Sequence, residues 1–355
     1  MNKTLIFTGG GSGGHVMPAL TLIQELKKMD CEIHYIGGYE SIEKDLVKPY
    51  QIQYHPIHNG KLRRYLSIEN MKDIFKVMLG TLQAFMLLMK FKRQSTLIFS
   101  TGGFVSIPVV VAAWMQGKRI YIHEQTSRVG LANKIASLFA NRVFISFDES
   151  KKFFPQNKTV YSGYPLRDEC FSTDVKDVVI NGKSLLQIQK PILFITGGGN
   201  GSQLLNELIK RNITELKKKY FIVHQVGKLP AEEYQKMNDD DYVALPFVGP
   251  EIIDLFKLAT VTLSRSGAGT VCELIAVGKK SIYVPLKIAQ KNEQYHNAME
   301  AKNKLGSIII EEKDLNDHSF FESLKQFSYP NTRQNVVKEN GKNILINEIK
   351  NFLNS

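Results

Sequence analysis

The feature that most constrains this chain is a glycine-rich turn that occurs twice, near its start and just past its middle. Residues 8–15 read TGGGSGGH after one apolar run, and residues 196–202 read TGGGNGS after another. Each turn leads into an amphipathic stretch, so each predicts a strand, a tight turn and a helix. A turn without Cβ atoms brings backbone N–H groups close to an anionic or sugar ligand, where a helix N-terminus adds positive potential. We therefore expect two nucleotide-binding-like domains that face each other across a cleft.

Length and composition are compatible with this organisation. The 355 residues suffice for two domains of roughly 150–200 residues each. A hydrophobic content of 43% and a charged content of 23% are ordinary for a soluble globular protein. The three cysteines are far apart and have no metal or disulfide spacing, which indicates a reducing cytoplasm. The first residues run straight into a strand-like segment, so we expect no signal peptide.

Strand-like and helix-like segments alternate along both halves, which predicts an α/β fold with parallel sheets covered by helices on both faces. Strands are expected at residues 5–7, 33–36, 52–57, 96–100, 120–123, 143–146, 192–195, 221–225, 243–245, 261–263 and 281–284. Helices are expected at residues 19–29, 42–48, 67–92, 108–116, 131–139, 204–216, 252–258, 270–276 and 292–304. A turn-rich break at Gly163 predicts domains of residues 1–162 and 163–337, with a helix over residues 338–355 returning to the first domain.

The net charge of +12 is concentrated in one segment. Between Lys61 and Arg93, eight basic residues stand against two acidic ones. The same segment contains apolar residues at helical spacing, among them Ile74, Phe75, Met78, Leu79 and Leu82. It is too short and too interrupted to span a bilayer, which takes about 20 apolar residues. The pattern fits either a membrane-surface helix attracted to anionic lipid or a core helix with a solvated basic face. No signature of nucleic-acid binding accompanies it.

A histidine ends the first glycine turn and is the first candidate for catalysis. His15 stands at the mouth of the first helix, with no carboxylate near it in sequence. The helix dipole favours the neutral imidazole that a general base requires. The alternative is a histidine that only caps or packs at a helix start. A dinucleotide fingerprint is weak in a turn with five glycines, and no Lys-Ser/Thr pair closes a P-loop.

Residues 264–273 form a third strand–turn–helix unit, SRSGAGTVCE. Small residues expose helix-terminal N–H groups that suit a diphosphate. Arg265 offers a fixed cation, and Glu273 offers a bidentate acceptor for a ribose diol. An ordinary helix N-terminus with an acidic residue near its start has the same pattern. Further on, Gln294 and its polar neighbours suit sugar hydroxyls, although a solvated helix face has a similar composition.

Two further segments end strands of the first half, at Thr101 and at His123-Glu124-Gln125. Strand ends of one parallel sheet converge, so both are expected beside the first glycine turn. Asp239-Asp240-Asp241 contains Asp-x-Asp, a diphosphate–metal motif in some sugar transferases, but it lies in a polar loop and is interpreted as a solvated turn. We find no cluster with metal-ligand spacing and expect no metal site.

Taken together, these segments resemble the UDP-N-acetylglucosamine transferases of peptidoglycan synthesis, the MurG family, which make lipid II from lipid I on the inner membrane face. The resemblance covers nearly the whole chain and depends on the order and spacing of its segments. The segments that carry it are residues 9–18, 100–106, 123–134, 163–167, 197–206, 264–273 and 294–298.

The resemblance implies a GT-B glycosyltransferase with two Rossmann-like domains, without a metal or other cofactor. The C-terminal domain would bind UDP-N-acetylglucosamine, and the N-terminal domain would bind undecaprenyl-linked lipid I at the cytoplasmic face of the membrane, as a peripheral protein. Glu273 would bind the ribose and Gln294 the sugar hydroxyls. The residues implied for donor binding are Ser12, Gly13, Gly14, Thr126, Arg167, Gly199, Val248, Arg265, Ser266, Ala268, Gly269, Thr270, Val271, Glu273 and Gln294.

The chain departs from the family pattern at three positions. Gly199 stands where the family usually has serine, Thr126 replaces a frequent asparagine, and Tyr164 lies in a Gly-Tyr-Pro-Leu-Arg segment in place of Gly-Asn-Pro-Val-Arg. The first loses a hydroxyl contact and the second leaves a donor amide contact open. None removes an obvious catalytic group.

The implied reaction is inverting transfer to the C4 hydroxyl of the N-acetylmuramyl unit, with His15 or Glu124 as the base. Another GT-B enzyme, such as a diacylglycerol glycosyltransferase, would share the fold and the donor site. A nucleotide-cofactor oxidoreductase or a non-enzymatic nucleotide-binding module is a more distant alternative. The absence of a ribose-binding acid after the second predicted strand counts against that alternative.

Overall fold

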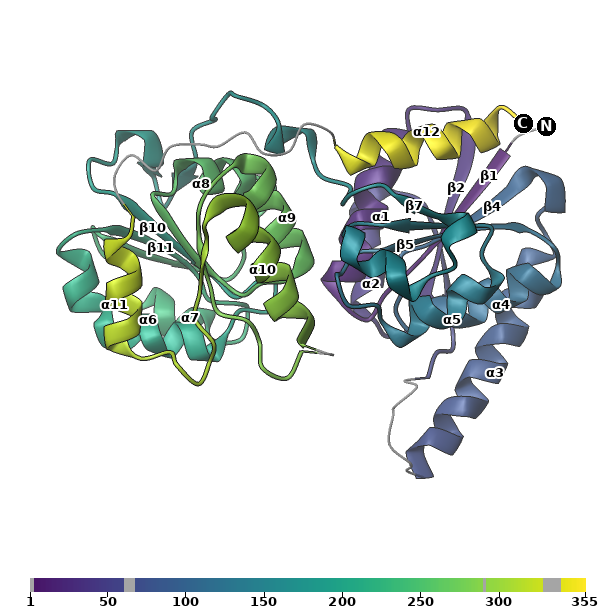
Figure 1. The fold of residues 1–355 in the computed structure, drawn as a ribbon, viewed down its shortest axis with the longest axis horizontal. Coiled ribbons are helices and arrows are strands. Elements are labelled where there is room, and N and C mark those ends of the chain that lie inside the picture. Colours follow the sequence, from purple (N-terminus) through teal and green to yellow (C-terminus); the bar gives the residue numbers. More distant parts are fainter. Residues whose placement is uncertain (1–2, 61–67, 290–291, 328–339) are drawn as a thin grey trace. The chain divides into compact units, whose positions relative to one another are not determined.

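A computed structural model describes residues 3–60, 68–289, 292–327 and 340–355 of the chain. The fold divides into two compact units (Figure 1). The first contains Met1–Leu166 and Glu339–Ser355, and the second contains Arg167–Lys338. Each unit is built around its own parallel β-sheet, which confirms the predicted α/β fold class with two Rossmann-like domains.

The first unit contains a seven-stranded sheet in the order β3-β2-β1-β4-β5-β6-β7. All of its neighbouring strands pair in parallel. The strands are β1 (Lys3–Thr8), β2 (Cys31–Gly38), β3 (Gln53–Ile57), β4 (Thr96–Ser100), β5 (Arg119–Glu124), β6 (Arg142–Ile145) and β7 (Thr159–Tyr161). The chain order reverses at β1, so the ends of β1 and β4 form the switch point where α/β proteins bind ligands.

Helices cover both faces of this sheet, because successive residues of a buried strand point to opposite faces. Leu5 and Phe7 pack with one set of helices, and Ile6 packs with the other. The first set is α1 (Gly13–Leu26), α2 (Ile42–Val47) and α12 (Gly341–Leu353). The second set is α3 (Ile68–Leu88), α4 (Ser106–Met115) and α5 (Leu131–Phe139). Each layer therefore has its own apolar core.

The C-terminal helix α12 belongs to the first unit and lies beside α1 (Figure 1). Asn340 anchors it, because its side chain accepts from the N–H of Leu166 at 3.0 Å and donates to the Leu166 carbonyl at 2.9 Å. Residues 163–166 consequently stay with the first unit, whereas the sequence analysis placed them in the second. Residues 338–339 of the expected helix lie outside the described residues.

The second unit contains a six-stranded sheet in the order β12-β11-β10-β13-β14-β15. Its strands are β10 (Ile192–Thr196), β11 (Phe221–Gln225), β12 (Tyr242–Leu245), β13 (Val261–Ser264), β14 (Ile282–Tyr283) and β15 (Ile308–Ile309). Its helices are α6 (Gln203–Lys217), α7 (Ala231–Gln235), α8 (Ile252–Leu258), α9 (Ala268–Val277), α10 (Glu293–Leu305) and α11 (Asp317–Lys325). Leu193 and Ile195 pack on the face that carries α6, α7 and α11, whereas Phe194 contacts Phe256 of α8.

The sequence analysis missed the short elements and misplaced one helix start. It did not predict β7, β15, α7, α11 or the hairpin of β8 (Val179–Ile180) and β9 (Lys183–Ser184), because most are too short to show a period. It began the first helix at residue 19, whereas α1 begins at Gly13 and contains Pro18. A proline inside a helix has no N–H for the carbonyl four residues earlier, which is why the pattern indicated a later start.

The anchor of α12 predicts a measurable stability effect. Asn340→Ala removes its two hydrogen bonds to Leu166 and its cap on the N–H of Lys342, which it accepts at 3.0 Å. Because the Leu166 groups are buried, the loss should cost about 1–3 kcal/mol of unfolding free energy. Urea denaturation measures it. Asn354→Ala, at the exposed end of α12, is the control and should change stability by less than about 0.5 kcal/mol.

Candidate functional site

In the first unit, three loops converge at the carboxyl ends of β1, β4 and β5, which are neighbours in the sheet. They are the first glycine turn, the segment from Thr101 to Gly103, and the segment from Glu124 to Gln125. The N–H of Gly10 donates to the Gly102 carbonyl at 3.1 Å, and the N–H of Thr101 donates to the Thr8 carbonyl at 2.8 Å. The predicted convergence of these strand ends is therefore confirmed.

One side of the first glycine turn is packed so closely that no side chain fits. A Cβ on Gly9 would lie 2.0 Å from the Thr101 hydroxyl, and a Cβ on Gly10 would lie 2.4 Å from the Glu43 carboxylate. At Gly11, which has a φ of +81°, and at Gly13, nothing lies within 4 Å of the same position. The turn therefore presents an open side with exposed backbone, as a ligand that approaches the chain closely requires.

A buried carboxylate that sequence analysis missed holds this turn in place. Glu43 of α2 has no exposed surface. Its two oxygens accept from the N–H of Gly11 at 3.2 Å and from the N–H of Gly38 at 3.0 Å. The Tyr35 hydroxyl adds a 2.6 Å bond to the Gly9 carbonyl. No local motif marks Glu43, because both of its donors lie elsewhere in the chain.

His15 is held with one ring nitrogen engaged. Its Nδ1 lies 3.0 Å from the Thr101 carbonyl and 3.3 Å from Oε1 of Gln125. Both partners are acceptors, since the Gln125 amide nitrogen donates to the carbonyls of Thr101 and His123. The proton of a neutral imidazole therefore resides on Nδ1, and Nε2 keeps its lone pair. This is the tautomer in which Nε2 acts as a base.

The carboxylate of Glu124, the alternative base, already accepts hydrogen bonds from residues close to it in the chain. Its buried carboxylate accepts from the N–H of Thr126 at 2.9 Å, from the Thr126 hydroxyl at 2.8 Å and from the Asn133 amide at 3.1 Å. These bonds join the loop after β5 to α5. The Thr126 hydroxyl also lies 2.7 Å from the Arg128 carbonyl, so both groups of Thr126 are engaged within the loop. The geometry favours His15 over Glu124 as the base.

The second glycine turn repeats the division into a packed side and an open side. A Cβ on Gly197 would lie 2.2 Å from the Gly201 backbone, and one on Gly201 would lie 2.0 Å from the Val226 carbonyl. At the exposed Gly199, no described residue lies within 4 Å of the position that a Cβ would take. Gln225, which the sequence analysis missed, links this turn to the loop that follows β12. Its amide nitrogen donates to the Gly198 carbonyl at 2.7 Å, and its oxygen accepts from the N–H of Val248 at 2.9 Å.

The start of α9 carries the features expected of an anion site. Its N-cap is Gly267, so no side chain caps the N–H groups of the first turn, which lack partners within the helix. Nearby, the Ser266 hydroxyl is fully buried and has no hydrogen-bond partner among the described residues. Ala268, Gly269 and Thr270 open the helix here, two residues earlier than the sequence analysis placed its start, and Val271 offers a ligand neither its side chain nor its N–H. Its side chain is buried and its N–H already bonds to the Gly267 carbonyl.

Arg167 and Glu273 form an ion pair at 2.9 Å, with side chains 24% and 15% exposed. Burial raises the pKa of the Glu273 carboxyl above its ordinary value, and Arg167 opposes this rise. Burial lowers the pKa of Arg167, but Glu273 more than offsets it, so the net pKa is raised. The pair fixes the carboxylate in one orientation, which suits a bidentate contact with a diol.

Two side chains predicted to bind a ligand directly also have structural partners. Arg265 pairs with Glu312 at 2.7 Å and donates to Ser202 at 3.0 Å. The sequence analysis expected a fixed cation here. The guanidinium is held in place, but Glu312 offsets its charge, and the α9 N-terminus adds positive potential at this site. Gln294 accepts from the N–H of Leu286 at 3.0 Å, which leaves its amide nitrogen as the group available for a ligand.

Within the described residues, no three His, Cys, Asp or Glu side chains are grouped to hold a metal ion. Asp239 of the Asp-x-Asp segment accepts from the N–H groups of Asp241 and Tyr242, both at 3.0 Å, and pairs with Lys217. It therefore serves as the acceptor of a turn.

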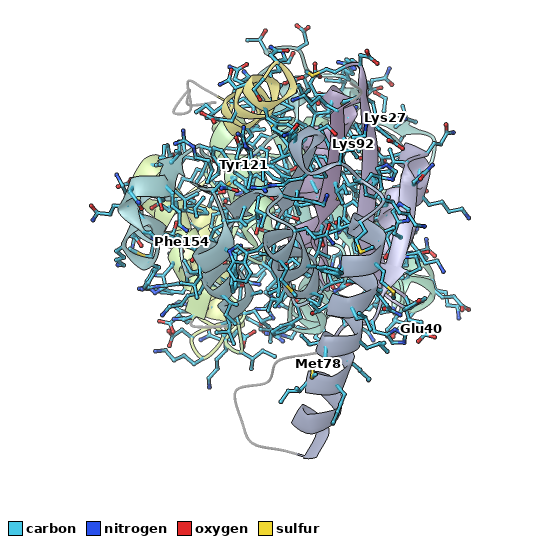
Figure 2. The ribbon with its side chains drawn as sticks, turned by 90° about the vertical axis from the view of Figure 1, so that its right-hand side faces the viewer. Lys27, Glu40, Met78, Lys92, Tyr121 and Phe154 are labelled. Atoms are coloured by element: carbon cyan, nitrogen blue, oxygen red, sulfur yellow. The ribbon has the colours of Figure 1, made fainter. Side chains whose placement is uncertain are left out.

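The apolar residues singled out on α3 form one exposed face. Ile74, Phe75, Met78, Leu79 and Leu82 are between 44% and 67% exposed. On the opposite side of the helix, Gly80 and Ala84 are buried against the unit. The part of α3 that carries Met78 projects beyond the body of the first unit (Figure 2), and its opposite side packs against the segment that contains His58 and Gly60.

The structure describes only part of the basic residues between Lys61 and Arg93. Lys61, Arg63 and Arg64 lie outside the described residues, whereas Lys76, Lys90, Lys92 and Arg93 are exposed. None of the helices in the described ranges is both long and apolar enough to cross a membrane.

Known proteins agree with this architecture. The model of the glycosyltransferase family 28 N-terminal domain matches residues 5–145, and that of the C-terminal domain matches residues 192–352. An Oceanobacillus iheyensis protein is 38% identical over 329 residues, covering 92% of this chain and 90% of its own. A Clostridium tetani protein is 36% identical over 356 residues, covering 99% and 97%. Both are UDP-N-acetylglucosamine--N-acetylmuramyl-(pentapeptide) pyrophosphoryl-undecaprenol N-acetylglucosamine transferases.

The chain belongs to this transferase family, within glycosyltransferase family 28. The resemblance to the MurG family is thereby confirmed. The solved structure of Acinetobacter baumannii MurG is 24% identical with a TM-score of 0.71, covering 98% of this chain and 99% of its own. The calicheamicin glycosyltransferase CalG4 is 12% identical with a TM-score of 0.68, covering 99% and 98%. These likenesses confirm the GT-B glycosyltransferase fold.

The open side of the second glycine turn predicts a variant that binds the donor more tightly. Gly199→Ser supplies the hydroxyl that the family usually has there, at a position where a Cβ meets nothing within 4 Å. One added neutral hydrogen bond, worth about 0.5–1.5 kcal/mol, should raise the affinity for UDP-N-acetylglucosamine roughly two- to tenfold. Calorimetric titration measures it.

Gly197→Ser is the matched control, because its Cβ would lie 2.2 Å from backbone. This variant should lose thermal stability and gain no affinity. Unchanged or weaker binding by Gly199→Ser would show that the donor does not approach this turn.

Proposed function

We propose that this protein transfers N-acetylglucosamine from UDP-N-acetylglucosamine to the C4 hydroxyl of the N-acetylmuramyl unit of lipid I, with inversion, to give lipid II. The relatives that share 36–38% of its sequence over nearly its full length carry names for an N-acetylglucosamine transfer to a pyrophosphoryl-undecaprenol acceptor. The observation that carries the proposal is that His15, at the first glycine turn, has Nδ1 engaged and Nε2 without a partner among the described residues. The other unit of the same chain has a helix N-terminus, at α9, that suits a diphosphate.

The donor is assigned to the second unit. Glu273, oriented by Arg167 at 2.9 Å, accepts both hydroxyls of the ribose. The first-turn N–H groups of α9, with the unpartnered Ser266 hydroxyl beside them, bind the diphosphate and stabilise the charge that develops on it as it leaves. The amide nitrogen of Gln294 is available for the N-acetylglucosamine hydroxyls. The proposal assigns no step to a metal ion.

The acceptor is assigned to the first unit, where His15 is the base. Nε2 of His15 takes the proton of the C4 hydroxyl as its oxygen attacks the anomeric carbon from the face opposite UDP. The bond between the anomeric carbon and the diphosphate oxygen breaks, UDP leaves with the electron pair, and the configuration inverts. The Thr101 carbonyl and Gln125 hold Nδ1–H at 3.0 and 3.3 Å and stabilise the imidazolium that forms.

Assays with lipid I and with diacylglycerol as acceptors test the assignment. Transfer to lipid I alone supports the proposal, whereas transfer to diacylglycerol alone would replace it with another GT-B activity.

If His15 is the base, its removal should lower turnover without changing stability. His15→Ala should lower turnover by about 10²–10⁴-fold and leave the UDP affinity and the unfolding midpoint unchanged, because the ring is only half-buried. Steady-state kinetics with lipid I measures the first and calorimetry the second.

Glu124→Gln is the comparison variant. It should mainly lower thermal stability, because an amide cannot accept all the donors that now surround this carboxylate. If Glu124→Gln abolished turnover in a folded protein while His15→Ala lost less than tenfold, the base would be Glu124.

We further propose that the protein binds the cytoplasmic face of the membrane peripherally through the exposed apolar face of α3. An undecaprenyl-linked acceptor stays in the bilayer, so the enzyme has to reach it there. Phe75 and Met78 are 67% and 62% exposed, and burying each in lipid is worth about 1.5–3 kcal/mol. Exposed basic residues at the C-terminal end of α3 and in the loop after it, among them Lys90 and Lys92, add attraction to anionic headgroups.

Flotation with vesicles tests this surface. Phe75→Ser with Met78→Ser should weaken binding to phosphatidylglycerol-containing vesicles at least tenfold and leave turnover on a water-soluble acceptor analogue unchanged. Leu229→Ser is the matched control, because Leu229 is fully exposed in the second unit. Equal binding of both variants would rule out α3 as the membrane contact.

A further inference from the structure

We propose that a cationic pocket at the amino-terminal edge of the first sheet is a binding site for a phosphate group. The pocket has a volume of about 510 Å³, and Arg93, Lys118 and Arg119 are among its lining residues. A second hollow of about 280 Å³ shares Arg119 and Asn141 and adds Arg142. The two hollows together bring four basic side chains to one place.

This pocket is separate from the candidate catalytic site. Arg119 and Arg142 are the first residues of β5 and β6, whereas His15 and Gln125 meet at the carboxyl ends of the strands. Six residues of β5 separate the two edges, which corresponds to about 20 Å of extended chain. A ligand of one site does not fill the other.

Ordinary helix packing accounts for only part of this charge. Cations collect where helices end, because the last carbonyls of a helix carry partial negative charge. Lys118 is engaged near such a helix end, since its Nζ donates to the Phe91 carbonyl, three residues past the end of α3. Arg93 donates through its Nε to the Gly117 carbonyl at 2.9 Å, and its terminal nitrogens have no hydrogen bond to another residue that the structure describes. Within the described ranges, neither Arg119 nor Arg142 has an ion pair with an acidic side chain.

The donors of the pocket are fixed in position. The Arg93 guanidinium lies against Gly117, whose φ is +64° and where a Cβ would come within 2.8 Å of the guanidinium carbon. Arg119 stacks over the Phe352 ring at 5.5 Å. Asn141 accepts from the N–H of Ile120 at 2.8 Å through its oxygen, which leaves its amide nitrogen as a donor. Two preset guanidinium groups beside amide donors match the oxygens of a phosphate.

The side chains that line the two hollows include no aspartate or glutamate. Ser355, which also lines the first hollow, adds the terminal carboxylate of the chain, but the four basic side chains outnumber it, so the net charge of the lining is positive and favours an anion. The chemistry is that of a phosphate mono- or diester, whether on a lipid headgroup or on a soluble molecule. The exposed Met89 and the exposed Trp114 and Met115, at the ends of α3 and α4, make a headgroup a reasonable source, and the experiment separates the two.

The test uses the full chain saturated with UDP, so that the proposed donor site is occupied. Inorganic pyrophosphate is titrated calorimetrically, and binding to vesicles of phosphatidylcholine with or without phosphatidylglycerol is measured in parallel. The variant is Gln94→Glu, which places a carboxylate in the pocket lining at an exposed residue. Gln24→Glu is the matched control, because it makes the same chemical change at an exposed position of α1.

We expect Gln94→Glu to weaken pyrophosphate binding at least tenfold and Gln24→Glu to leave it unchanged, with lipid I turnover normal in both. A parallel loss of phosphatidylglycerol binding in Gln94→Glu alone assigns the site to a lipid headgroup, and unchanged vesicle binding assigns it to a soluble phosphate. Equal pyrophosphate binding by both variants, or none by the wild-type protein, would overturn the proposal. Turnover that fails in every protein, wild type included, contradicts the proposed function and not this pocket.

Discussion

The close approach of backbone to backbone at the first glycine turn is the contact on which the catalytic end of the first unit depends. Gly10 bonds to the Gly102 carbonyl at 3.1 Å, and Gly103, with a φ of +84°, would bring a Cβ within 2.1 Å of the Gly10 carbonyl. Two backbone segments can approach each other this closely only where their residues lack a Cβ atom. The same approach brings the Thr101 carbonyl to His15. The orientation of the imidazole is therefore a consequence of how tightly two glycine segments pack.

Most buried polar groups around the candidate site serve this framework. Glu43, Glu124 and Gln225 each accept or donate two or more hydrogen bonds to loop groups. Buried polar groups are stable only when their hydrogen bonds are satisfied, so each of them fixes the loop it contacts. Among the described residues, Nε2 of His15 in the first unit and the Ser266 hydroxyl beside the α9 N–H groups in the second are unengaged groups at the candidate site, although a few other buried hydroxyls, such as that of Thr8, also lack a partner. Reactive and ligand-binding groups stand out because their neighbours are already paired.

The two edges of the first sheet differ in chemistry for a topological reason. Parallel strands with crossover helices place helix N-termini at the carboxyl edge and helix C-termini at the amino edge. The carboxyl edge thus offers N–H donors and holds the imidazole, whereas the amino edge, where helix carbonyls carry partial negative charge, gathers side-chain cations such as Arg93 and Arg119. Both edges end up suited to anions, one through backbone and the other through guanidinium groups.

The sequence alone determined the two-unit α/β fold and the glycine turns, because period-2 and helical patterns and Cβ-free turns are local properties of the chain. It also singled out His15 and Glu273 as candidates, because each stands at a glycine-rich strand–turn–helix unit. It could not find Glu43 or Gln225, whose partners lie 5 to 32 and 23 to 27 residues away, nor show that Arg265 is paired with Glu312. The choice between His15 and Glu124 also required the tertiary structure. The sequence shows only that both residue types can act as a base. The hydrogen bonds that occupy the Glu124 carboxylate depend on how the loop after β5 folds, and those that hold Nδ1 of His15 depend on packing between distant segments.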